Sequence, residues 1–110
     1  MIQQLRIYEI YEHNKAAFHA RFRDHAMRIM KRYGFDFVSL WEARSDRGTD
    51  FVYLLAWPDL AAKEAAWRGF MADGEWKEIK RITKAQHGDL VGHIDDRVLS
   101  PTPYSPVPSR

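Results

Sequence analysis

One histidine on a predicted helix is the first side chain of this sequence that could do acid–base chemistry. His25 stands in a run where Phe18, Phe22, Ile29 and Tyr33 recur at spacings of three or four residues, which is typical of an amphipathic helix. This spacing predicts that His25 lies on the sheet-facing stripe, where its imidazole could act as acid or base, or bind haem or a metal. The alternative is a core histidine that is hydrogen-bonded to a neighbour.

Arg6 and Tyr8 form a second candidate pair. They are two residues apart on a predicted strand, so they share one of its faces. A guanidinium among apolar side chains is costly to bury unless it is paired. Arg6 therefore binds an anionic ligand, pairs with a carboxylate such as Glu42, or lies at a dimer rim. Tyr8 would orient a substrate and is, with His25, a candidate for a catalytic role.

Three aromatic residues of the central strands are candidate ligand-binding residues beside Arg6. Trp41, Tyr53 and Trp57 could stack on a planar substrate. The alternative is that they pack in the core or in an interface.

Motifs for metals and common cofactors are missing from the sequence. It has no cysteine, which excludes a disulfide framework, a thiolate nucleophile and cysteine zinc sites. It also has no phosphate loop, dinucleotide fingerprint, nucleophile elbow or HExxH zinc motif. We therefore expect no metal and no cofactor. Haem is the one alternative kept open, to be tested by titration with haemin.

Composition indicates one globular domain. The chain has 110 residues, of which 45% are apolar and 29% charged, with a formal net charge of +2. The basic residues of the first helix are interrupted by Asp24, unlike the one-sided stripe of a nucleic-acid binder. The longest apolar run, Phe51–Trp57, is far shorter than the ~20 residues of a membrane span. We expect a cytoplasmic protein that binds neither nucleic acid nor membrane.

The predicted elements follow the order β-α-β-β-α-α-β. Strands are expected over residues 4–12, 35–43, 51–57 and 90–99, and helices between Asn14 and Gly34, from Asp59 to Asp73, and over residues 75–86. This order predicts an α+β, ferredoxin-like fold, with a four-stranded antiparallel sheet and helices on one face. The domain spans residues 1–100, and a proline-containing tail follows over residues 101–110.

Both faces of this sheet carry large apolar side chains. On the third strand, one face has Phe51, Tyr53, Leu55 and Trp57, and the other has Val52 and Leu54; on the second strand, Phe35, Phe37 and Trp41 are expected opposite Val38 and Leu40. Each such side chain gains roughly 1.5–3 kcal/mol on full burial, yet the helices can cover only one face. We expect a homodimer in which a second copy covers the other face. The alternative is a monomer covered by the extra helix and the tail.

Four stretches in fixed order resemble the NIPSNAP family: Leu5–Tyr8, Val52–Leu60, Asp73–Trp76 and Val98–Pro106. The resemblance covers nearly the whole chain and departs from the family at Gly74, where proline is expected. It implies a ferredoxin-like fold paired into a dimeric αβ barrel, a docked tail, and a small-molecule pocket between the first helix and the sheet. It implies no settled activity.

Two functions therefore compete. One is a small-molecule-binding protein or a cofactor-free monooxygenase or isomerase acting on an aromatic or oxidised metabolite, with a cavity beside His25. The other is a non-catalytic dimeric module that binds a ligand or a protein partner. Fold alone does not decide whether the protein is an enzyme.

Overall fold

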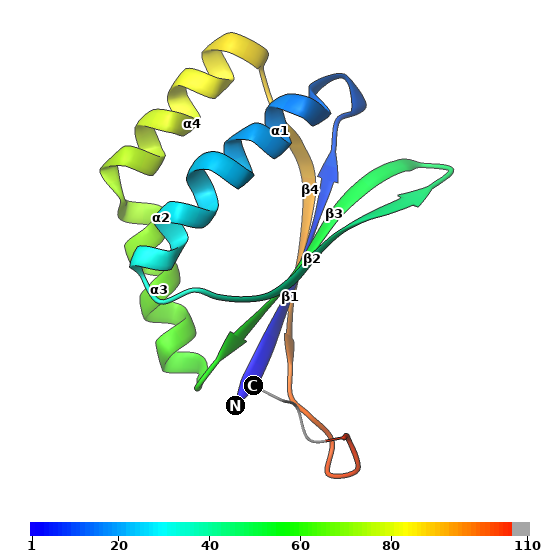
Figure 1. Cartoon of the computed structure of the whole chain (residues 1–110), viewed down its shortest axis with the longest axis vertical. Coiled ribbons are helices and arrows are strands. Elements are labelled where there is room, and N and C mark those ends of the chain that lie inside the picture. Colours follow the sequence, from blue (N-terminus) through cyan, green and yellow to red (C-terminus); the bar gives the residue numbers. More distant parts are fainter. Residues whose placement is uncertain (107–110) are drawn as a thin grey trace.

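A four-stranded antiparallel sheet, covered on one side by helices, forms the described part of this computed structural model, residues 1–106 (Figure 1). The strands are β1 (Ile2–Ile10), β2 (Asp36–Ser45), β3 (Gly48–Trp57) and β4 (Val91–Leu99), in the spatial order β2-β3-β1-β4. The helices are α1 (Lys15–Arg21), α2 (Met27–Arg32), α3 (Leu60–Ala72) and α4 (Gly74–His87), with a 3-10 turn η1 (Glu12–Asn14) and a π-helix η2 (Phe22–Ala26). The predicted α+β fold is confirmed.

Aspartate side chains begin the two later helices. Asp59 accepts a hydrogen bond from the backbone N–H of Ala62 at 2.8 Å, and Asp73 accepts one from Trp76 at 2.9 Å. Such N-caps satisfy N–H groups that have no partner within the helix. Asn14 precedes α1 but makes no capping hydrogen bond with its side chain, which donates instead to the carbonyls at positions 87 and 89. It thereby fastens the start of the first helix to the end of α4.

A β-bulge in β2 corrects the predicted faces of that strand. Phe37 pairs with Leu55, but the next pairing joins Ser39 to Leu54, so Val38 is an extra residue. An inserted residue reverses the alternation of side chains beyond it. Leu40 therefore faces the helices, and Trp41 faces the opposite side of the sheet. The prediction that Trp41 shares a face with Phe37 is wrong.

The uncovered face of the sheet is apolar at its centre. Leu5 and Ile7 of β1 pair with Leu54 and Val52 of β3 there, and none of these four is fully buried. Trp41 beside them is 48% exposed. The helices pack against the other face, where Tyr53, Leu55 and Trp57 are almost completely buried. The structure contains one chain, so the homodimer stays a prediction.

The tail is exposed over residues 101–106, although Pro101, Ser105 and Pro106 line a small pocket together with Met1 and Gln3; its docking stays a prediction. All six are exposed, Tyr104 by 87%, and they extend beyond the end of the sheet (Figure 1). Residues 107–110 of the predicted tail lie outside the described residues.

Gly69→Ala tests the packing of α3 against α2 and is expected to destabilise the domain by about 1–3 kcal/mol. An added Cβ would lie 2.5 Å from Cδ1 of Tyr33, whose hydroxyl is held by Asp73 at 2.6 Å. Gly→Ala within a helix ordinarily stabilises by about 1 kcal/mol. A decrease in the free energy of unfolding, measured by urea denaturation, would therefore indicate the clash with Tyr33. The control is Gly74→Pro at the first position of α4, where a Cβ has open space and proline is favoured. It should be neutral or stabilising, and a stabilised Gly69→Ala would contradict the packing.

Val52→Lys tests whether a second copy covers the uncovered face. We predict that the wild-type chain sediments as a dimer and that a lysine at the centre of this apolar face dissociates it. Leu60→Lys is the matched control, because Leu60 is an exposed apolar residue of the helix layer. Sedimentation velocity measures the mass. A wild-type species of 13.0 kDa would refute the dimer.

Candidate functional site

A chain of hydrogen bonds runs from Arg6 into the core on the helix side of the sheet. Nη2 of Arg6 donates to the hydroxyl of Tyr8 at 3.0 Å, and the hydroxyl oxygens of Tyr8 and Tyr53 are 2.5 Å apart. The predicted shared face of Arg6 and Tyr8 is confirmed. Tyr53 comes from the neighbouring strand, opposite Arg6 in the register of β1 and β3.

The guanidinium of Arg6 is held between a carboxylate and an indole. Its Nη1 lies 3.3 Å from Oδ2 of Asp96, and its Cζ lies 4.4 Å from the centre of the Trp67 ring. The side chain is only 15% exposed, and its Nε is buried without a hydrogen-bond partner in the described part of the chain. Arg6 is therefore paired, but with Asp96 and not with Glu42, which binds His19 and Lys15 instead.

The surroundings of Arg6 and Tyr53 determine the protonation states of these two side chains. Burial acts to lower the pKa of Arg6, but interactions with Tyr8 and Tyr53 outweigh it and raise the pKa above its ordinary value. Burial, aided by Tyr8, raises the pKa of Tyr53 well above its usual range. The site therefore presents a permanent cation next to a phenol that stays protonated at neutral pH.

Gln4 positions the other members of the site. Its buried side-chain amide donates to Asp96 at 2.9 Å and accepts from the indole N–H groups of Trp57 and Trp67 at 2.9 and 2.8 Å. Sequence reasoning missed Gln4, Trp67 and Asp96 as site residues. One signal was present, because Gln4 is a polar residue on the same strand face as Arg6 and Tyr8.

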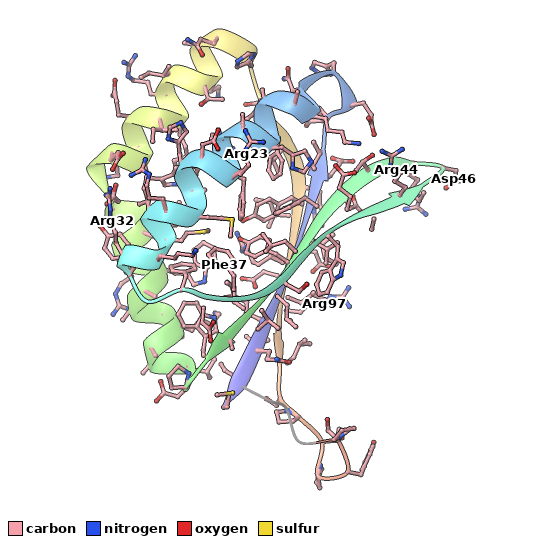
Figure 2. The ribbon with its side chains drawn as sticks, in the orientation of Figure 1. Arg23, Arg32, Phe37, Arg44, Asp46 and Arg97 are labelled. Carbon is pink, nitrogen blue, oxygen red and sulfur yellow. The ribbon has the colours of Figure 1, made fainter. Side chains whose placement is uncertain are left out.

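A cleft of about 560 Å³ opens beside this cation, and we name it the Arg6 cleft. It is lined by Gln4, Arg6, Lys63, Glu64, Trp67, Arg68, Met71 and Asp96. Apolar residues of β4 continue the same side of the sheet, where Ile94 and Val98 are each 45% exposed. Arg97 of the same strand instead points away from the helices (Figure 2).

His25 does not lie in this cleft, and its predicted position on the sheet-facing stripe is wrong. It lines a groove between the first helix and α4, and Nη2 of Arg28 donates to its Nδ1 at 3.3 Å. The π-helix is the cause. In a π-helix residue i bonds residue i+5, so each residue advances by a smaller angle around the helix axis than in an α-helix. The next buried position after Phe22 is therefore Ala26 and not His25.

The predicted aromatic set is divided by the sheet. Tyr53 and Trp57 are almost fully buried on the helix side, and Trp41 lies on the uncovered face. These three side chains cannot stack on one ligand. Within residues 1–106, no three metal-ligating side chains come together, and no helix is long and apolar enough to cross a membrane.

The NIPSNAP family model matches residues 3–106, and several solved structures share the fold. A protein from Agrobacterium tumefaciens has a TM-score of 0.80 at 19% identity, covering 97% of this chain and 99% of its own. An uncharacterised NIPSNAP domain protein from Burkholderia xenovorans has a TM-score of 0.79 at 20% identity, with 97% and 100% covered. A structure described as an antibiotic biosynthesis monooxygenase has a TM-score of 0.61 at 12% identity, with 94% and 100% covered. No curated protein matches the chain.

Gln4→Leu tests the role of the buried amide. The substitution removes the acceptor of two indole N–H groups, and each donor left unsatisfied costs about 1–3 kcal/mol. We expect a loss of about 2–4 kcal/mol in the free energy of unfolding, measured in urea. Gln3→Leu is the control, because its side chain is on the uncovered face of the same strand. Equal effects of the two substitutions would contradict the role given to Gln4.

Proposed function

The chain belongs to the NIPSNAP family, and from that premise we propose that it binds a small, planar organic anion in the Arg6 cleft. The observation that carries the proposal is the guanidinium of Arg6. It is a nearly buried cation whose carboxylate partner, Asp96, is 40% exposed and whose Nε has no partner within residues 1–106. A ligand oxygen can therefore compete for this cation.

The chemistry of the cleft favours an anion attached to a flat ring. Arginine presents a planar fork of donors that matches a carboxylate or an enolate. The Trp67 indole already stacks on the guanidinium at 4.4 Å, so a ring in the cleft can pack against the same aromatic wall. Lys63 and Arg68 add positive charge at the lining, and the volume of about 560 Å³ is within the range of small-molecule sites.

The reaction class that fits this site is cofactor-free isomerisation or monooxygenation through an enolate. Arg6, held in place by the Tyr8 hydroxyl, would stabilise the enolate oxygen, and Asp96 would accept a proton from carbon. In an isomerase, that proton returns to a different carbon. In a monooxygenase, dioxygen converts the CH2 group to a carbonyl, and its second oxygen atom leaves as water. The similarity in fold to a structure described as a monooxygenase supports this class by analogy alone.

Binding without turnover is the second candidate function. Both carboxylate oxygens of Asp96 are engaged, one by Gln4 and one by Arg6. The lining of the cleft contains no imidazole, and His25 lies in a different groove. A module that binds a ligand, or a protein partner through that ligand, needs no free base. This observation favours the non-catalytic alternative.

Arg6→Met tests the proposed ligand site. We expect planar aromatic carboxylates to quench the fluorescence of Trp67, and Arg6→Met to weaken their binding at least about tenfold, because a charge-assisted hydrogen bond contributes about 1.5–3 kcal/mol. Arg97→Met is the matched control, since Arg97 is on the other face of the sheet. A Trp41→Phe background removes the signal of the exposed indole. Equal affinity of the Arg6 and Arg97 variants would exclude the site.

The same ligands separate the two candidate functions. Enolisation is measured as exchange of a carbon-bound proton with deuterium from solvent, and monooxygenation as consumption of dioxygen. Asp96→Asn should abolish either reaction while the ligand still binds. Ligands that bind at Arg6 but show neither reaction with the wild-type protein would leave the non-catalytic module as the function.

A further inference from the structure

Two cations, Arg21 of α1 and Lys80 of α4, meet over the ring of Trp76. The Cζ atom of Arg21 lies 5.3 Å from the ring centre, and Nζ of Lys80 lies 5.8 Å from it. Phe70 stacks on the same ring, with centroids 5.1 Å apart and an interplanar angle of 26°. Because Phe70 occupies one face of the indole, the other face is left for both cations.

These two cations lack a counter-ion within residues 1–106. Arg28 and Arg32 of the same helix layer each pair with Glu75, whereas Arg21 and Lys80 contact the indole and no carboxylate. Burial lowers the pKa of each, and the charge of Arg21 lowers the pKa of Lys80 further. Two partly buried like charges side by side destabilise one another unless an anion joins them.

A groove of about 360 Å³ gives access to Arg21 from solvent. It runs between the first helix and α4, and its apolar lining includes Ala17, Ile79 and Ile82, the last of which is 41% exposed. Asp24 also lines the groove, but its carboxylate is bonded to Arg23 at 2.8 Å. The groove therefore combines an apolar wall with a cation that no acidic neighbour neutralises.

We propose that this groove binds a phosphate monoester, with its apolar substituent against Ile79 and Ile82 and its phosphate on Arg21. Lys80 is not part of the groove lining, but it lies over the same indole ring as Arg21 and can reach a phosphate bound there. A phosphate monoester carries a charge of about −1.5 to −2 at neutral pH, which matches two cations better than a single carboxylate does. The guanidinium fork suits phosphate oxygens, and the ammonium acts as a second point charge. This site shares no residue with the Arg6 cleft and does not depend on the function proposed for it.

Phenyl phosphate is the probe for this site, followed by isothermal titration calorimetry with the full chain. We expect it to bind more tightly than inorganic phosphate, because the ring contacts the groove. Arg21→Met and Lys80→Met should each weaken binding at least tenfold, and Lys77→Met, an exposed lysine of the same helix, should change it less than twofold. Without ligand, Lys80→Met should unfold at a temperature no lower than wild type, since it removes a repulsion.

Vesicles containing phosphatidate distinguish the source of the phosphate group. Retention on these vesicles that is lost in Arg21→Met and competed by phenyl phosphate would support the proposal with a lipid as ligand. Binding of phenyl phosphate without retention would support it with a soluble ester. Three results would overturn the proposal. Phenyl phosphate at millimolar concentration gives no heat of binding, it binds no more tightly than inorganic phosphate, or its binding is lost in Arg6→Met and kept in Arg21→Met.

Discussion

A cation inside an apolar layer must be paired, and Arg6 imposes this requirement on the space between sheet and helices. Its partners come from three elements: Tyr8 from β1, Asp96 from β4 and Trp67 from α3. Gln4 in turn bonds both Asp96 and Trp67. The last strand and the third helix are therefore positioned around one charge, and the cleft beside it follows from that arrangement.

The order of elements and the covered face were predictable from local patterns. Alternation places Arg6 and Tyr8 on one side of β1. Ser45–Gly48 is a run of turn-forming residues, and the structure joins β2 and β3 there as a hairpin. Two irregularities escaped the same reasoning. The bulge at Val38 and the π-helix at Phe22–Ala26 each interrupt a regular period without a glycine or proline to mark them. Trp41 and His25, which follow or lie within these irregularities, were therefore assigned to the wrong sides.

The remainder of the site depends on contacts between distant parts of the sequence. Gln4 and Asp96 are 92 residues apart, and their contact depends on the register of β1 against β4. Neighbouring residues of a strand, such as Asp95 and Asp96, point to opposite faces, but alternation does not say which of the two meets Arg6. Trp67 has no signal as a site residue, because a single sequence shows the apolar character of an indole and not the partner of its N–H group.

The last strand, β4, lies at an edge of the sheet: within residues 1–106, β1 pairs with one side of it and no strand pairs with the other. Elements with few partners open more readily than the rest of a domain. A transient separation of β4 from β1 would carry Asp96 away and leave the Arg6 charge to water or to an incoming anion. Local opening of this edge strand would thus link the local stability of the sheet to the rate at which a ligand can enter.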